Sequence, residues 1–315
     1  MGDKAYKELT VLSGKGGTGK TSLVAAFAAL AREAVLADCD VDAADLHLIL
    51  QPCVQTEGEF SGGSVASVRT DLCTACGLCG ELCRFDAIKN GGLVASGAEA
   101  PRVDPLSCEG CGVCAWFCPA DAIAMTPRRS GRWYESHTRF GPMAHAELIP
   151  GQENSGKLVS LVRERARTLA ERNGRRLIVV DGAPGVGCPV IASATGADAA
   201  LIVTEPTIAG RHDLERVLGL VEHFEIPAAV CVNRYDINVQ VTEEIEALCR
   251  GRGVINAGRV RYARDVVRAM MAGRTVIELA GVPIAGEIEA VWKRTLALLD
   301  KEAGEKPAGE DRKEE

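Results

Sequence analysis

The sequence Gly-Lys-Gly-Gly-Thr-Gly-Lys-Thr occupies residues 14–21 and has the spacing of a phosphate-binding loop. An apolar run at residues 8–13 precedes it, and an alanine-rich helical pattern follows from Gly19 to Arg32. A strand, a glycine loop and a helix in this order surround phosphates with backbone N–H groups. Lys20 is expected to reach the terminal phosphates and the Thr21 hydroxyl to bind Mg²⁺. The candidate nucleotide-binding residues of this loop are Gly14, Gly16, Gly17, Thr18, Gly19, Lys20 and Thr21.

Acidic residues follow two further apolar runs. Residues 34–37 end in Asp38-Cys39-Asp40, and residues 176–181 end in Asp181, followed by Gly182-Ala183-Pro184-Gly185. Carboxylates at the C-terminal ends of parallel strands lie where an open α/β sheet binds its ligand. We therefore expect these acids beside the phosphate loop.

Eight of the thirteen cysteines form two runs with the spacing C-x2-C-x2-C-x3-C. This is the bacterial ferredoxin arrangement, in which three cysteines of one run and the fourth of the other hold each [4Fe-4S] cluster. The spacing predicts two clusters rather than zinc, which favours two separated pairs of cysteines. The predicted ligands are Cys73, Cys76, Cys79 and Cys118 for one cluster, and Cys108, Cys111, Cys114 and Cys83 for the other.

An internal repeat supports the pairing of the two runs. At an offset of 35 residues the cysteines superimpose, as do Gly77 and Gly112, and residues 86–88 and 121–123 (both Asp-Ala-Ile). A duplicated half-unit is what a two-cluster fold with pseudo-two-fold symmetry requires. The repeat differs where Pro119 follows the second run and Arg84 the first, and a guanidinium facing a cluster would raise its potential.

Lys15 makes the loop more specific. The pattern Lys-Gly-Gly-x-Gly-Lys-Thr resembles the deviant Walker A loop of the MinD, ParA and nitrogenase iron protein superfamily of P-loop ATPases. The cysteine runs make the chain similar to members with an inserted ferredoxin domain. The resemblance implies a homodimer that closes over two ATP molecules, with Lys15 reaching the nucleotide of the facing subunit.

The same resemblance assigns roles to the acids. It implies that Asp40 orients the attacking water, that Asp38 supports the Mg²⁺ shell and that Asp181 holds Mg²⁺ through water. Gly185 would donate its backbone N–H to the γ-phosphate, and Asn233 would contact the base. Residues 233–236 (Asn-Arg-Tyr-Asp) also resemble the guanine-reading motif Asn-Lys-x-Asp, so the base stays open between ATP, which the superfamily uses, and GTP.

Composition limits the partners. The formal net charge is −7 and the pI is near 5.5, which argues against a non-specific nucleic-acid binder. No apolar run approaches the roughly 18 residues that cross a bilayer, and the start lacks a signal-peptide core. We expect a cytoplasmic protein that binds neither nucleic acid nor membrane.

The predicted fold class is α/β: a mostly parallel P-loop NTPase sheet with an inserted small α+β ferredoxin-like domain. The predicted parts are residues 1–65 and 154–299 for the ATPase domain, 66–126 for the insert, 127–153 for a connecting hairpin and 300–315 for a disordered charged tail.

Two features allow alternative interpretations. The basic and aromatic stretch at residues 128–153 is predicted either as a solvated hairpin packing on the insert or as a docking surface for an acidic redox partner. Cys188, seven residues beyond Asp181, is predicted as a buried cysteine, with a cluster shared between subunits as the alternative.

These features predict a magnesium-dependent ATPase that couples nucleotide-driven changes to electron transfer through two [4Fe-4S] clusters. Its partners would be a second copy and a redox partner protein or client enzyme. One alternative is an ATPase that assembles or carries iron-sulfur or other metal cofactors. Another is a MinD-like positioning ATPase with sensory clusters.

Overall fold

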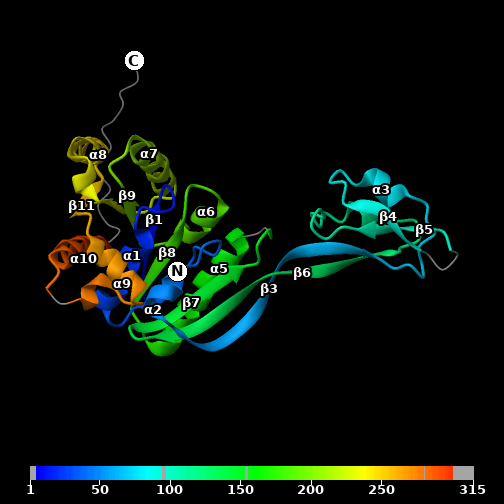
Figure 1. Ribbon diagram of the computed structural model, residues 1–315, viewed down its shortest axis with the longest axis horizontal. Coiled ribbons are helices and arrows are strands. Elements are labelled where there is room, and N and C mark those ends of the chain that lie inside the picture. The colour runs from blue at the N-terminus through cyan, green and yellow to red at the C-terminus, as the bar shows by residue number, and fades with distance from the viewer. Residues whose placement is uncertain (1–4, 94–96, 153–154, 280, 301–315) are drawn as a thin grey trace, which may run out of the picture. The chain divides into compact units, whose positions relative to one another are not determined.

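The computed structural model describes residues 5–93, 97–152, 155–279 and 281–300. The chain forms two compact units, whose elements are labelled in Figure 1. The first unit comprises residues 1–57, 134–146 and 159–315, and the second comprises residues 58–133 and 147–158. The predicted tail, apart from Asp300, lies outside the described residues, and the predicted domain boundaries stay predictions.

Nine strands form one sheet in the order β11-β10-β9-β1-β8-β2-β7-β6-β3. Every pair from β11 to β7 is parallel, which confirms the predicted α/β class with a mostly parallel sheet. The strands are β1 Lys7–Ser13, β2 Val35–Asp38, β3 Cys53–Val68, β6 Ile123–Thr138, β7 Gly141–Leu148, β8 Leu177–Pro184, β9 Ala199–Thr204, β10 Ala228–Asn233 and β11 Ile255–Val260.

Strand register brings the predicted site residues to one edge of the sheet. Val11 near the end of β1 is opposite Asp181 on β8, and Asp38 at the end of β2 is also opposite Asp181. Strand β2 is buried from end to end, and β8 is buried except at its first and last residues. The phosphate loop and the acids therefore meet because parallel strands end on the same side.

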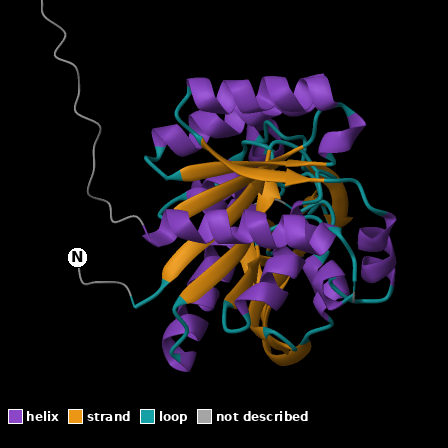
Figure 2. Cartoon of the chain, turned by 90° about the vertical axis from the view of Figure 1, so that its left-hand side faces the viewer, coloured by secondary structure: helices purple, strands orange, loops and turns teal. Residues whose placement is uncertain are grey.

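Helices cover both faces of this parallel sheet (Figure 2). Neighbouring residues of β9 point to opposite sides, so Leu201 packs in one core with α1 and α10 while Ile202 packs in the other with α7. Val291 and Trp292 of α10 are buried in the same core as Leu201, so this helix covers one face of the sheet. The helices outside residues 58–133 are α1 Lys20–Ala31, α2 Leu46–Leu50, α5 Ser155–Asn173, α6 Cys188–Ala194, α7 Ile208–His223, η1 Tyr235–Ile237, α8 Val239–Gly251, α9 Arg264–Met271, η2 Val276–Glu278 and α10 Ile284–Asp300.

The second unit contains a small two-stranded sheet and two short helices. The antiparallel strands are β4 Ile88–Leu93 and β5 Glu99–Val103, and the helices are α3 Leu78–Leu82 and α4 Val113–Trp116. The repeat is visible in the backbone, because Gly77 and Gly112 both have φ of 77°. Asp86 and Asp121 also share positive φ, at 53° and 48°, which is uncommon for residues other than glycine. The two halves thus adopt the same local conformations.

The stretch predicted as a solvated hairpin is instead part of the main sheet. The first six residues of β7 are buried, and Met143, Ala144 and His145 pair with β2. Met143, Ala144 and Ala146 are fully buried, so the strand lies in the interior. The strand places its residues directly beside the acid-bearing end of β2.

His145 of β7 is a buried histidine in an aromatic and hydroxyl environment. Its Nε2 lies 2.8 Å from Ser136 Oγ, and its ring stacks on Tyr134 at 4.9 Å between centroids. Burial, and to a smaller extent His47, lowers the pKa of His145 to about 4. The imidazole is therefore neutral in the folded chain at neutral pH.

This depressed pKa predicts a specific acid sensitivity. Because the unfolded imidazole titrates near 6.5, its contribution to stability is complete above that pH and is lost as pH falls towards about 4. His145→Gln should remove a pH-dependent loss on the order of 3 kcal/mol over this interval. Urea unfolding at pH 7 and pH 4.5 measures it, with the exposed His212→Gln as control. An unchanged difference between the two pH values in His145→Gln would contradict the assignment.

Candidate functional site

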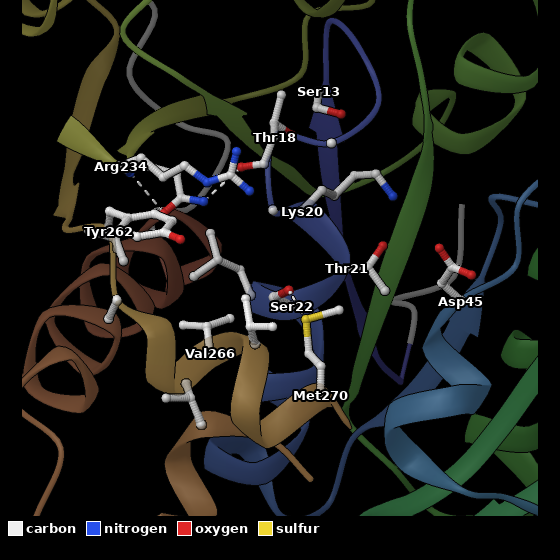
Figure 3. A pocket seen from close by; sticks show the side chains of 18 of the residues that line it. Ser13, Thr18, Lys20, Thr21, Ser22, Asp45, Arg234, Tyr262, Val266 and Met270 are labelled. Carbon is white, nitrogen blue, oxygen red and sulfur yellow. Dashed lines mark hydrogen bonds between the residues drawn. The ribbon is translucent and has the colours of Figure 1, made fainter. Parts of the chain in front are cut away.

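The phosphate loop opens onto a cavity of about 540 Å³ at the C-terminal edge of the parallel strands. Lys20 and Thr21 lie towards one end of the cavity, Arg234 and Tyr262 lie towards the other, and Met270 of α9 lies along the floor (Figure 3). A polar end followed by an apolar floor suits a ligand with charged groups and a flat apolar body.

Lys20 is held among carboxylates. Its Nζ lies 2.5 Å from Asp181 Oδ1 and 3.6 Å from Asp40 Oδ2, and its side chain is 5% exposed. Burial alone would favour the neutral amine, but the charge of Asp181, its hydrogen bond and then Asp40 outweigh burial and raise the pKa of Lys20. The ammonium is charged and positioned at the base of the loop.

Asp38 shapes the loop that carries Asp40. Its Oδ1 accepts a hydrogen bond from the backbone of Asp40 and its Oδ2 one from Leu46, both at 3.2 Å. The side chain is fully buried, and burial followed by the charge of Asp181 raises the pKa of Asp38 well above its ordinary value. Burial also raises the pKa of Asp40. The site holds more acid than one lysine neutralises.

This arrangement fits a divalent cation. Among the described residues, Asp181 Oδ2 is buried and has no hydrogen-bond partner, and the same holds for Thr18 Oγ1. Thr21 lines the same cavity. Carboxylate and hydroxyl oxygens are the ligands that Mg²⁺ prefers, directly or through water. Thr21 and Asp181 would hold Mg²⁺ directly or through water, whereas both oxygens of Asp38 already accept backbone hydrogen bonds and its predicted role toward Mg²⁺ stays a prediction.

Two predicted nucleotide contacts are engaged within the chain. The Gly185 N–H donates to the carbonyl of Ser13 at 2.9 Å, and Asn233 Nδ2 donates to the carbonyl of Thr18 at 2.7 Å. Asp236 Oδ1 accepts from the backbone of Tyr262 at 2.7 Å. The roles of Gly185 and Asn233 toward nucleotide stay predictions, and one of the two Asp236 oxygens has a backbone partner.

Glu205, for which the sequence indicated no role, lies beside Lys15. Lys15 Nζ lies 2.5 Å from Glu205 Oε1, and Arg234 Nη1 lies 3.4 Å from Oε2. Glu205 directly follows the buried strand β9. The rule that selected Asp38 and Asp181, an acid at the end of a buried strand, could have found it. The apolar floor from α9 carried no comparable sequence signal.

In the second unit the eight cysteines line two separate cavities. One of about 240 Å³ is lined by Cys83, Cys108, Cys111 and Cys114. The other, of about 20 Å³, is lined by Cys73, Cys76, Cys79 and Cys118. Each cavity thus takes three cysteines from one run and the fourth from the other. Within the part of the chain that the structure describes, no three Cys, His, Asp or Glu side chains are arranged to hold a single metal ion.

The surroundings of the cysteines fit iron-sulfur clusters. Backbone N–H groups already point at sulfur, from Ala75 to Cys73 Sγ at 3.4 Å and from Ala122 to Cys118 Sγ at 3.2 Å. Such hydrogen bonds tune cluster potentials. Four thiol groups around one cavity are the donor set that a [4Fe-4S] cluster takes. The cysteine assignments stay predictions that this geometry supports.

Comparison with known proteins identifies the family. Residues 9–276 match the family model described as the CobQ/CobB/MinD/ParA nucleotide binding domain. The chain belongs to this family. Its phosphate loop, Asp38, Asp40 and Asp181 all lie within the matched residues.

A curated relative and solved structures are also similar to this chain. Uncharacterized protein MJ0578 of Methanocaldococcus jannaschii is 33% identical over 234 residues, covering 73% of this chain and 79% of that protein. The cell division ATPase MinD of Pyrococcus furiosus superposes with a TM-score of 0.54 at 15% identity, covering 93% of this chain and 99% of its own. The MinC:MinD complex of Aquifex aeolicus gives 0.53 at 18% identity, with 96% and 100% covered. At these identities the structures show the shared fold alone.

Two further observations concern this CobQ/CobB/MinD/ParA chain. Cys188 begins α6 and is exposed, so the prediction of a buried cysteine is wrong. The short helix starts there after Gly187, and this end of the helix leaves the thiol uncovered.

Among the helices of the described ranges, none is long and apolar enough to cross a bilayer.

Proposed function

We propose that this member of the CobQ/CobB/MinD/ParA family is a magnesium-dependent ATPase that couples nucleotide binding and hydrolysis to electron transfer through two [4Fe-4S] clusters. The observation that carries the proposal is the sorting of the cysteines into two crossed sets. The same chain holds a cationic phosphate loop with buried acids beside it. A phosphate loop or a pair of cysteine sets alone would be compatible with other functions. Their combination in one chain favours a nucleotide-dependent redox function.

Nucleotide binding would rearrange the Lys20 ion pair. A terminal phosphate attracts the ammonium, which then shares its charge between the phosphate and Asp181. Asp181 Oδ2, which has no hydrogen-bond partner among the described residues, would then face the metal shell while Oδ1 stays near Lys20. Bound Mg²⁺ supplies charge neutralisation at the phosphates, and Asp40, partly exposed at the cavity, orients the attacking water.

The loop after β8 is the proposed switch. Gly185, at φ of 95°, donates to Ser13, the residue directly before the phosphate loop. A γ-phosphate would compete for this N–H group, so the loop would change its hydrogen bond when ATP replaces ADP. In many switch proteins a loop becomes ordered, disordered or rearranged according to whether the γ-phosphate is bound.

The cysteines of the second unit would retain the redox groups. Bound [4Fe-4S] clusters would supply one-electron carriers. Arg128 donates to the carbonyls of Pro105 and Cys108 and so fixes the loop that begins the second run, the latter at 2.7 Å. Cys108 itself is buried, which favours a retained cluster over one passed on to a client.

The base and the dimer are proposed from the same observations. Asp236 Oδ1 accepts from the backbone of Tyr262, and its second oxygen stays open within the described residues, so the choice of base follows the nucleotides bound by proteins of the same fold. A MinD of Pyrococcus horikoshii with the same fold was solved with Mg-ADP, and Cyanothece McdA(D38A) with ATP. We propose ATP as the nucleotide, a homodimer as the active form and a redox protein or client enzyme as electron acceptor.

An anaerobic redox titration tests this function. In the proposed ATPase the cluster potentials change when Mg-ATP binds, because the switch responds to the phosphate. Clusters that titrate identically with and without nucleotide would count against coupling.

A further inference from the structure

Lys15, the first lysine of the phosphate loop, is held by an acid of its own chain. Its ammonium lies 2.5 Å from Glu205, and the two side chains are 36% and 16% exposed. The other oxygen of Glu205 lies 3.4 Å from Arg234, which lines the nucleotide cavity. One carboxylate is thus shared between two cations at the mouth of the site.

The backbone keeps Glu205 at this place. It follows β9, which pairs with β1 just before the phosphate loop, with Val11 opposite Leu201 and Leu12 opposite Ile202. Two residues later Thr207 caps α7 by accepting from the Gly210 N–H at 2.9 Å. The loop therefore has a defined conformation between a paired strand and a capped helix.

Close packing against α7 fixes the positions of the phosphate loop and of the loop that carries Glu205. A β-carbon at Gly210 would collide with the carbonyl of Glu205, and one at Gly14 would collide with Asp213 of α7. The phosphate loop and the loop that carries Glu205 therefore both pack closely against α7. The Lys15–Glu205 pair follows from this fixed spacing and not from a chance surface encounter.

We propose that Glu205 is a positioning residue. It holds Lys15 in the position seen in the nucleotide-free chain, and this ion pair must break before two subunits close over nucleotide. The inference rests on the proposed function, in which Lys15 acts on the nucleotide of the facing subunit. A partly exposed ion pair is weak, so the multiple charges of a bound triphosphate can displace the carboxylate. Glu205 then sets how much nucleotide and protein are needed before the subunits pair.

Glu205→Gln tests this role, because glutamine keeps the size of the side chain and removes its charge. The variant should pair in Mg-ATP at about a fivefold lower protein concentration, since each of two subunits no longer breaks an ion pair. Sedimentation velocity over a range of protein concentrations measures the midpoint. Glu205→Asp, which keeps a carboxylate, should fall between the two proteins. Glu215→Gln is the matched control, an acid of α7 that lies 3.6 Å from Arg211, and should behave as wild type.

A double-variant cycle tests the Lys15–Glu205 ion pair separately from the association of two subunits. In nucleotide-free protein, Lys15→Met combined with Glu205→Gln should lower the melting temperature by less than the sum of the two single losses, because both changes break the same ion pair. Independent, additive losses would show that the two residues do not interact and would overturn the inference. A wild-type chain that pairs as readily as Glu205→Gln would overturn the positioning role while the proposed dimer stands. If neither protein pairs in Mg-ATP, the dimeric form fails, and the positioning role fails with it.

Discussion

Replacing Lys20 with methionine is expected to reduce ATP hydrolysis at least about a hundredfold, the size of effect seen when one preorganised charge-stabilising donor is removed. Lys20 is the buried cation at the base of the phosphate loop, 2.5 Å from Asp181. Methionine keeps the aliphatic length and removes the charge. Steady-state phosphate release measures the loss. Hydrolysis at the wild-type rate would remove Lys20 from the site.

The same change should also destabilise the nucleotide-free chain. Without the ammonium, Asp181 is left buried beside Asp38 and without a cation, which costs about 3 kcal/mol for a broken buried pair. Urea unfolding measures the difference, with Lys7→Met, an exposed lysine on β1, as the matched control. Lys20→Arg keeps a cation and should recover most of the stability but not the hydrolysis. This pair of variants separates folding from catalysis.

Replacing Cys111 with alanine is expected to halve the iron and sulfide content, from about eight to about four of each per chain. Cys111 is exposed and lines the larger cysteine cavity, so the change removes a ligand with little loss of packing. Iron and acid-labile sulfide analysis of anaerobically reconstituted protein measures it. Cys53→Ala, an exposed cysteine outside the two runs, should keep the full content.

The crossed arrangement makes a sharper prediction. Cys83 belongs to the first run but lines the cavity of the second, together with Cys108, Cys111 and Cys114. Cys83→Ala should therefore lose the same EPR signal as Cys111→Ala, and Cys118→Ala the other one. If Cys83→Ala instead loses the signal that disappears in Cys73→Ala, each run holds its own cluster and the crossing is wrong.

The parallel core of the fold was predictable because its strands are apolar runs that end in glycine or acid. Val35–Asp38 and Leu177–Pro184 differ from the predicted strands by at most a few residues at their ends. The strand β3 was not predicted. It runs over 16 residues, and its first five residues are exposed, so it shows no apolar periodicity to recognise. Strand β7 lies within the stretch predicted as a hairpin, and its pairing with β2 in the main sheet was not predicted because that pairing joins segments far apart in the sequence.

The site was predictable where chemistry fixes the spacing of residues. The loop at residues 14–21 and the cysteine runs must surround a ligand of known shape, so their sequence spacing carries the geometry. The resting contacts were not predictable. Glu205 meets Lys15 and Asn233 meets Thr18 across long stretches of chain, and only the register of β1, β9 and β10 brings them together.

The central claim is that nucleotide state alters the redox groups, and an anaerobic EPR-monitored redox titration tests it most directly. The reconstituted wild-type chain and Lys20→Met would be titrated without nucleotide, with Mg-ADP and with Mg-ATP, after iron and sulfide have been quantified. We predict that Mg-ATP shifts the potential or spectrum of at least one [4Fe-4S] cluster in the wild type and in no cluster of Lys20→Met. Two intact clusters that titrate identically in all three conditions would contradict the account.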